Sequence, residues 1–161
     1  MVRELSHYIG GHHAAGLSGR FGDVFDPCSG QVQARVALAG REEVQNAVAV
    51  AEKAQPEWAA MNPQRRGRIL LRFVDLVNRD LDSLARLLSS EHGKTLADSK
   101  GDIQRGLEVV EFAAGAPHLL KGEFSSDAGP GIDIHSLRQP LGVGLQALQP
   151  LELIGHVFVI Q

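Results

Sequence analysis

Helical hydrophobic periodicity between residues 42 and 116 constrains the fold of this chain more than any other feature. In its first segment, residues 42–60, apolar side chains recur at spacings of three and four: Val44, Ala47, Val48, Ala51, Ala54 and Trp58. This spacing is typical of a helix that buries one face. Two further segments of the same kind follow, so any fold must cover several apolar helix faces.

The second helical segment begins at Asn62-Pro63, where Asn is a good N-cap and Pro suits the first helical position. It is predicted to run as one helix to Gly93, with its apolar face formed by Ile69, Leu70, Phe73, Val77, Leu81, Leu84 and Leu88. Arginines on the opposite face suggest an anion or nucleic-acid site. However, Asp75 precedes Arg79 by four residues and Asp82 precedes Arg86 by four. That order favours helical ion pairs on a solvated face.

The third helical segment begins at Thr95, with Asp98 in the place of the usual capping-box Glu. Its main apolar face consists of Leu96, Ile103, Leu107, Val110 and Ala114. Val109 and Phe112 form a second apolar patch, and Arg105 projects into the same sector. Two apolar faces predict a helix that is enclosed between a core and another element.

Short strands are predicted on both sides of the helices. Phe21–Phe25 and residues 31–38 form a hairpin around the turn 26–30, which has Pro at its second position and Gly at its exit. Residues 132–141 alternate as a strand beyond the Gly-Pro-Gly loop at 129–131. The fold class predicted from these elements is α/β.

Composition excludes several classes of protein. The 161 residues are 43% hydrophobic and 22% charged with a net charge of −3, which argues against disorder and against binding to nucleic acid or anionic membranes. The N-terminus has no apolar signal segment, and no stretch is long enough to span a membrane. A single cysteine, Cys28, favours a reducing compartment. We therefore expect a cytoplasmic location.

Motifs for metal or nucleophilic chemistry are weak. The seven histidines have no helical pairing, and His12-His13 is interpreted as part of a solvated glycine-rich loop. Cys28 falls in the predicted turn with no base near it, so we do not expect a nucleophile. Residues 142–147 match Gly-x-Gly-x-x-Ala, but Pro150 interrupts the helix that this dinucleotide fingerprint requires. We interpret that match as chance.

Several motifs together resemble the beginning of an aldehyde dehydrogenase. They are Tyr-Ile-Gly-Gly at 8–11, Phe-Asp-Pro at 25–27, the strand at 30–38, Ala-Gln-Pro-Glu-Trp at 54–58 and Asn-Pro-Gln-Arg-Arg at 62–66. Residues 89–95 (Ser-Ser-Glu-His-Gly-Lys-Thr), 101–112 and 117–123 are similar to the CoA-acylating methylmalonate-semialdehyde dehydrogenases in particular. The resemblance covers residues 7–143.

The resemblance implies the N-terminal part of an NAD-binding domain. This part comprises the hairpin, three helices and residues 132–141 as a strand of the oligomerisation arm. The family oxidises malonate and methylmalonate semialdehyde with NAD, in valine catabolism among other routes, and transfers the acyl group to coenzyme A. The chemistry uses a thiolate nucleophile, a hydride transfer and thioester capture.

One residue role follows from the resemblance. The Arg of the family's Gln-Arg-Gly motif helps to hold the substrate carboxylate, and it matches Arg105. A guanidinium presents a planar fork that suits a carboxylate, and Val109 and Phe112 would form the apolar wall beside it. The residues alone favour a plainer interpretation, in which Arg105 forms a surface ion pair with Asp102 or Glu108.

After Val143 the sequence departs from the family pattern. Residues 144–161 do not match the family's first Rossmann strand or its Pro-Phe-Asn-Phe-Pro loop, so we divide the chain into a partial dehydrogenase domain, 1–143, and a divergent tail, 144–161. The Rossmann sheet, the catalytic domain, the nucleophilic Cys and the general-base Glu find no match. We therefore expect a truncated member, inactive alone and binding neither NAD nor coenzyme A.

Two other functions remain open from the sequence. The hairpin and residues 132–141 would allow a non-catalytic interaction module that pairs with a full-length subunit through edge strands. Residues 142–147 would allow free-standing NAD binding, the weakest of the three hypotheses.

Overall fold

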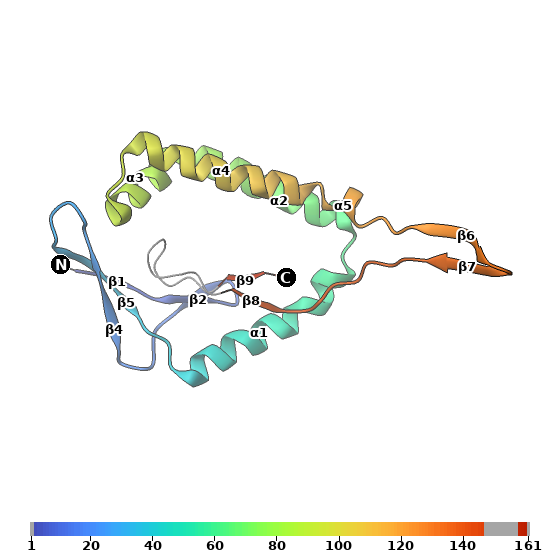
Figure 1. The fold of residues 1–161 in the computed structure, drawn as a ribbon. Helices are drawn as coiled ribbons and strands as arrows, with labels where there is room; N and C mark the ends of the chain where they lie inside the picture. The colour runs from blue at the N-terminus through green and yellow to red at the C-terminus, as the bar shows by residue number, and fades with distance from the viewer. Residues whose placement is uncertain (1, 147–157, 161) are drawn as a thin grey trace.

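The computed structural model describes residues 2–146 and 158–160. The described elements follow one another as β1 (Arg3–Leu5), β2 (His7–Ile9), β3 (His12–Ala14), β4 (Phe21–Phe25), β5 (Val32–Ala37), α1 (Arg41–Ala60), α2 (Pro63–Arg79), α3 (Leu81–His92), α4 (Leu96–Ala114), α5 (Ala116–Leu119), β6 (Phe124–Gly129), β7 (Ile132–His135), β8 (Gly144–Gln146) and β9 (Phe158–Ile160). Figure 1 shows a helical layer, a small sheet beside it and a hairpin that projects away from both.

A three-stranded sheet has the order β1-β5-β4, with β1 parallel and β4 antiparallel to β5. The predicted hairpin is confirmed, and its turn closes through a hydrogen bond of 2.7 Å from the Gly30 N–H to the Asp26 carbonyl. The Asp26 carboxylate also accepts from the Cys28 N–H at 2.9 Å. Val24 and Ala34, which face each other across the two strands, are buried and begin the core of the sheet.

The N-terminus of α1 is tied to the preceding loops by one side chain. Glu43 accepts hydrogen bonds from the Leu17 and Gly40 N–H groups, each at 2.7 Å. These donors, Gly40 first, lower the pKa of Glu43, because they stabilise its charged form. The carboxylate thereby caps a helix whose preceding residue, a glycine, has no side chain to do so.

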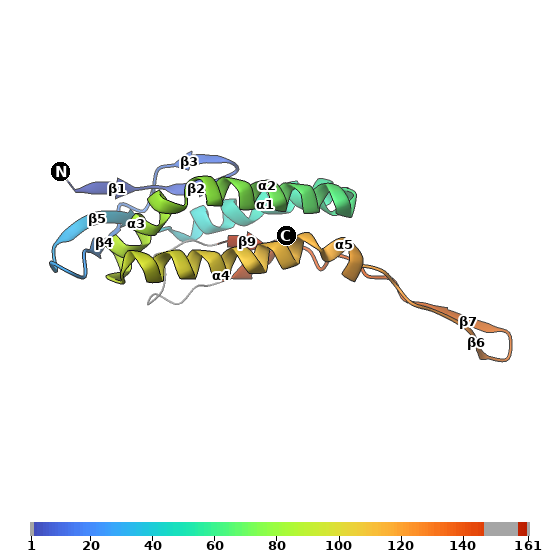
Figure 2. The same cartoon turned by 90° about the horizontal axis from the view of Figure 1, so that it is seen from above.

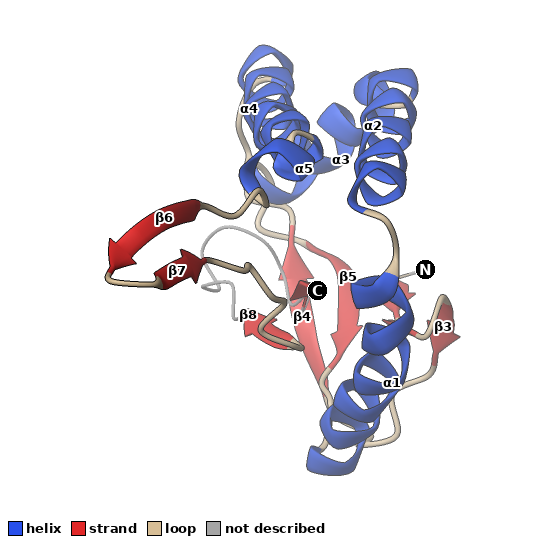
Figure 3. Ribbon diagram, turned by 90° about the vertical axis from the view of Figure 1, so that its right-hand side faces the viewer, coloured by secondary structure: helices blue, strands red, loops and turns tan. Residues whose placement is uncertain are grey.

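The predicted first helix is confirmed in position, as α1, but not in burial. Val44 is exposed, and Val48 and Trp58 are only half-buried. Among the described residues, none in α1 is fully buried. Figures 1 and 3 show why: α1 stands apart from the layer that contains α2, α3 and α4.

The predicted second helix is two helices, and the expectation of one continuous helix was wrong. Asp80 separates α2 from α3: its N–H still bonds to Leu76, but its backbone (φ −102°, ψ 12°) leaves the helical region. Its carbonyl then accepts from the Leu84 N–H at 3.0 Å and starts α3. Aspartate is a poor interior helix former, and here its carboxylate accepts from Arg79 instead of capping α3.

The ion pairs on this face also differ from those predicted. Arg79 binds Asp80 at 2.7 Å rather than Asp75, because the helix boundary brings the neighbouring carboxylate within reach. Asp82 binds Lys100 of α4 at 2.6 Å rather than Arg86. The face is solvated, but among its described arginines only Arg79 forms an ion pair, and the pair of Asp82 with Lys100 links two helices instead of two turns of one helix.

The predicted third helix is confirmed in position, as α4, which packs against both α2 and α3. The expectation that it is enclosed on both apolar faces was wrong, because Val109 and Phe112 are exposed. Its Leu107 is buried, as are Val74 of α2 and Ala85 of α3. A Cβ on Gly67 would lie 2.8 Å from the Ala114 carbonyl oxygen, so glycine allows α2 and α4 to approach closely. These contacts form the helical part of the core.

A second hairpin extends beyond α5 and projects from the helices (Figures 1 and 2). The strand predicted at 132–141 is shorter, as β7, and it pairs antiparallel with β6, which sequence patterns missed. The residues of β7 are all exposed. β6 lacks a clean alternation of apolar residues, and this explains the missed strand.

The region after the β6–β7 hairpin is described only in part. Gly142 has φ +113°, and β8 pairs antiparallel with β9. Part of the predicted tail, residues 147–157 and 161, lies outside the described residues. Within the described part of the chain, no helix has both the length and the apolar character needed to cross a membrane.

Candidate substrate-binding site

Lys94 lies on a short loop whose shape is set by a glycine. Gly93 ends α3 with φ +82°, and its N–H bonds to the Ser89 carbonyl at 2.8 Å. A Cβ at Gly93 would lie 2.9 Å from Cγ of Pro27, in the turn of the sheet. The positive φ and the lack of room for a Cβ both require glycine, so Gly93 sets the course of the backbone into Lys94.

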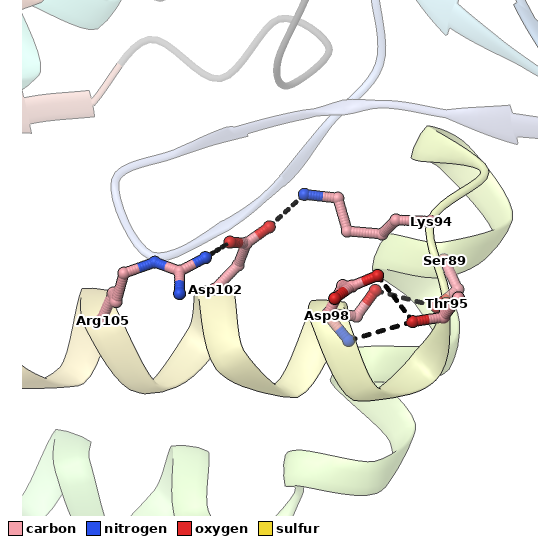
Figure 4. A network of polar contacts seen from close by, with 7 residues as sticks. Ser89, Lys94, Thr95, Asp98, Asp102 and Arg105 are labelled. Carbon is pink, nitrogen blue, oxygen red and sulfur yellow. Dashed lines mark hydrogen bonds and ion pairs between the residues drawn. The ribbon is translucent and has the colours of Figure 1, made fainter.

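Thr95 starts α4 next to this loop. Its Oγ1 accepts from the Asp98 N–H at 3.2 Å and donates to the Asp98 carboxylate at 2.7 Å. Ser89 and Ser99 join α3 to α4 through a hydroxyl–hydroxyl hydrogen bond of 2.8 Å, and Ser99 is buried. The predicted N-cap is therefore confirmed, and the first turns of α4 are held against α3 (Figure 4).

Asp102 lies between two cations. One carboxylate oxygen binds Lys94 Nζ, and the other accepts from Nη2 of Arg105, one turn further along α4 (Figure 4). The exposed fraction of the side chain is 21% for Lys94, 30% for Asp102 and 70% for Arg105. Lys94, and then Arg105, hold the pKa of Asp102 below its usual value. Asp102 is therefore charged at neutral pH.

Arg105 combines this ion pair with an apolar surrounding. Val109 and Phe112 follow it at spacings of four and seven on α4 and are 68% and 70% exposed. Gly101, which precedes it by one turn, presents no side chain there, and a Cβ would lie 3.6 Å from Nη1 of Arg105. An exposed guanidinium beside an apolar surface is suited to a small carboxylate with a short carbon chain.

Of the two ion pairs that the sequence offered to Arg105, the structure forms the one with Asp102. This pairing does not remove the guanidinium from use, because Asp102 contacts one of its nitrogens and shares its charge with Lys94. Sequence reasoning missed Lys94. Its spacing of eight residues from Asp102 crosses the start of a helix, so no periodic pattern signals the contact.

Other candidate residues lie elsewhere. Cys28 is exposed in the turn between β4 and β5, as predicted. His12 and His13, expected in a loop, form β3, where the ring of His13 packs edge-on against Tyr8 and its Nδ1 lies 3.1 Å from Ser6 Oγ. In the described part of the chain, no group of three or more His, Cys, Asp or Glu side chains is arranged to hold a metal ion.

A hollow of about 590 Å³ lies at the N-terminus of α1 and shares no residue with the Lys94–Asp102–Arg105 network. Its lining includes His7, Leu17 and Glu43. His7 Nε2 lies 3.5 Å from Glu43 Oε1, and the Glu43 oxygens are already used by backbone donors. Among the described residues, His7 Nε2 is buried without a hydrogen-bond partner, so the hollow offers one free ring nitrogen beside a carboxylate whose oxygens are in use.

The chain is similar to aldehyde dehydrogenases in both its family match and its relatives. The model of the aldehyde dehydrogenase family matches residues 15–148. Malonate-semialdehyde dehydrogenase from Pseudomonas aeruginosa is 42% identical over 139 residues, 86% of this chain and 28% of the relative. Malonate-semialdehyde dehydrogenase 2 from Geobacillus thermodenitrificans is 43% identical over 142 residues, 88% of this chain and 29% of the relative. The chain thus spans less than a third of the length of these relatives.

Solved structures show the same similarity. A protein described as a methylmalonate-semialdehyde dehydrogenase of Sinorhizobium meliloti 1021, in complex with NAD, is 55% identical with a TM-score of 0.85 over 88% of this chain and 29% of that one. The methylmalonate-semialdehyde dehydrogenase of Oceanimonas doudoroffii is 40% identical with a TM-score of 0.82 over 88% of this chain and 28% of that one.

Proposed function

This chain belongs to the aldehyde dehydrogenase family, and from that premise we propose that it provides the carboxylate-binding part of a malonate- or methylmalonate-semialdehyde dehydrogenase. The reaction is the NAD-dependent oxidation of a short semialdehyde that carries a carboxylate, with transfer of the acyl group to coenzyme A. The observation that carries the proposal is Arg105, an exposed guanidinium next to exposed Val109 and Phe112 on one face of α4.

The role of this chain's residues is to bind and orient the substrate. The Arg105 guanidinium donates hydrogen bonds to the carboxylate of the semialdehyde, and the apolar side chains of Val109 and Phe112 lie beside its carbon chain. The carboxylate end is thereby fixed, and the aldehyde carbon is directed away from α4.

NAD accepts the hydride in the family reaction, and the Sinorhizobium relative was solved with it. The described residues at 142–146 do not fit a dinucleotide cradle, because Gly144 begins a strand rather than a helix. We therefore assign no NAD contact and no coenzyme A contact to this chain. We also infer that the 161-residue polypeptide alone does not turn over, since its single cysteine lies in the turn 26–30 and does not match the family's nucleophile.

The domain division and the location remain part of the proposal. We place the dehydrogenase-like domain at 1–143 and a divergent tail at 144–161. A lone exposed thiol fits a reducing compartment such as the cytoplasm.

The proposal is tested in a full-length enzyme that carries residues 7–143 of this chain in place of the matching segment of the Sinorhizobium relative. Arg105→Met should lower kcat/KM for malonate semialdehyde by about 10- to 100-fold, because a hydrogen bond to a charged group is worth about 1.5–3 kcal/mol. Oxidation of propanal, which has no carboxylate, should change less than about twofold. Equal losses for both aldehydes would contradict the proposal.

A second function, pairing with another subunit, is supported by the exposed β6–β7 hairpin. Phe124, Ile132 and Ile134 are each more than half exposed on it. Apolar side chains on a projecting hairpin favour burial against a partner chain. Co-expression of the tagged chain with a full-length homologue should recover both proteins, and the variant Phe124→Ser with Ile134→Ser should lose the partner. Equal recovery with both forms would exclude the hairpin as the contact.

A further inference from the structure

Asp102 is shared between two cations that differ in exposure. Lys94, the less exposed of the two, binds one carboxylate oxygen, and Arg105 binds the other. Counted together, one carboxylate and two cations give the network a formal charge of +1. The side chain that carries this surplus to the surface is Arg105, since its exposed fraction of 70% is more than three times the 21% of Lys94.

The net charge of the three side chains determines how strongly the network attracts a substrate carboxylate. Without Lys94, Asp102 and Arg105 would form a neutral pair, and a substrate carboxylate would have to compete with Asp102 for the guanidinium. With Lys94 in place, the charge of Asp102 is already compensated, so the guanidinium keeps a net attraction for a second anion. Lys94 and Asp102 are partly buried, so water and salt screen their interaction less than that of the exposed Arg105.

The local backbone fixes the geometry of this arrangement. The backbone before Lys94 is constrained, because Gly93 has φ +82° and a Cβ there would meet Pro27. Asp102 and Arg105 share one face of α4, where a spacing of three brings side chains together. Arg105 uses Nη2 for Asp102, and the guanidinium has further N–H groups on its other edges.

We propose that Lys94 and Asp102 are positioning residues for the substrate carboxylate: Asp102 orients the Arg105 guanidinium, and Lys94 compensates Asp102 so that Arg105 keeps its charge for the ligand. The ligand class is a small aldehyde with a terminal carboxylate, and the inference rests on the proposed function of Arg105. The network then determines specificity for charged over uncharged aldehydes rather than the chemistry of oxidation.

The test is a charge series in the same full-length enzyme that carries residues 7–143 of this chain. Lys94→Gln brings the network to zero charge, Asp102→Asn brings it to +2, and the double variant returns it to +1. Lys94→Gln should raise KM for malonate semialdehyde about tenfold with kcat within about twofold, and leave propanal unchanged. Lys94→Arg should restore KM, because it keeps the charge.

The double variant separates charge from mere structure. If Lys94 acts by compensating Asp102, then Lys94→Gln with Asp102→Asn should recover most of the loss in KM. A KM that rises for both aldehydes alike, or a double variant that is worse than Lys94→Gln, would overturn the inference and leave Lys94–Asp102 as a structural clamp. The melting temperature of each variant serves as the control for folding.

Arg105→Met distinguishes the proposed function from the positioning role. If Arg105→Met loses the preference for malonate semialdehyde over propanal and Lys94→Gln does not, the proposed function stands and this inference fails. If Arg105→Met keeps the preference, both fail. As an independent readout, malonate is titrated into the full 161-residue chain and the Arg105 Nε–H is followed by NMR. Lys94→Gln should weaken the response several-fold, and equal responses would contradict the role of Lys94.

Discussion

The helical layer and the projecting hairpin of this protein differ in where their apolar side chains lie. In the layer formed by α2, α3 and α4, Val74, Ala85 and Leu107 are buried against one another's helices. In the hairpin, β7 is exposed along its whole length, and Phe124 of β6 is exposed as well. The layer therefore has a small core of its own, although its helices also expose large apolar side chains: Ile69, Leu71, Phe73, Leu76, Leu87, Leu96, Val109 and Phe112. The hairpin depends on its turn and backbone pairing. Substitutions in the two regions should differ accordingly.

Leu107→Ala should have the largest effect. Leu107 is 3% exposed, and its truncation leaves a cavity between α4 and its neighbours. We expect the free energy of unfolding to fall by about 2–5 kcal/mol. Chemical denaturation followed by far-UV circular dichroism measures the change, with exposed Val109→Ala on the same helix as the matched control. A loss below about 1 kcal/mol for Leu107→Ala would show that the layer has no effective core.

Two glycines with positive φ, one in each region, allow the next comparison. A Cβ at Gly93 (φ +82°) would lie 2.9 Å from Pro27, whereas a Cβ at Gly131 (φ +71°), at the tip of the hairpin, would meet open space. Gly131→Ala should cost about 1 kcal/mol from backbone strain alone. Gly93→Ala adds a steric clash, so we expect a total of about 2–3 kcal/mol. Equal losses in melting experiments would mean that the contact with Pro27 carries no weight.

Thr95→Ala should have a smaller effect within the helical layer. Thr95 Oγ1 accepts from the Asp98 N–H and caps α4. Loss of this cap should lower the free energy of unfolding by about 1 kcal/mol, and Thr95→Ser should retain most of it, because the hydroxyl is kept. Hydrogen exchange at the first turn of α4 reports the same change locally. Unaltered protection in Thr95→Ala would contradict a capping role.

Ile134→Ser should have the smallest effect on unfolding. Ile134 lies on β7 and is more than half exposed, so its replacement should change the free energy of unfolding by no more than about 0.5 kcal/mol. The same change at half-buried Ile103 of α4 serves as the control and should cost more. A large loss at Ile134 would show that the hairpin is already covered, as it would be by pairing with a second chain.

Local sequence signals located three of the four long helices and the β4–β5 hairpin, because the causes of these elements are local. They did not locate β1, β3, α5 or β6, and they merged α3 with α2. Asn62-Pro63 and Thr95 begin helices, and Gly93 ends one, through interactions within a few residues. The break at Asp80 was missed, because the apolar pattern continues across it and a single aspartate is a weak signal. β6 was missed because its pairing with β7 compensates for a sequence without alternation.

The residues of the candidate site also differ in whether the sequence could indicate them. Its guanidinium was found by resemblance at Arg105, and Asp102 was one of two partners that the helix spacing allowed. The contact of Lys94 with Asp102 was not predicted, since it depends on the conformation of the loop between α3 and α4. Nor does the sequence tell how far a predicted apolar face is buried, as the poorly covered α1 shows.

Residue identity and short-range chemistry were enough to predict the N-caps Asn62 and Thr95, the helix end at Gly93, the turn at 26–30 and the family. The separation of α3 from α2 and the cap that Glu43 gives to α1 were not predicted. The packing of the elements decided two ion pairs that no sequence pattern indicated: Asp82 of α3 with Lys100 of α4, and Lys94 with Asp102. Ionic contacts depend on distances of a few ångströms between side chains, and the packing of α3 against α4 sets those distances. The same packing gives Arg105 its charge balance.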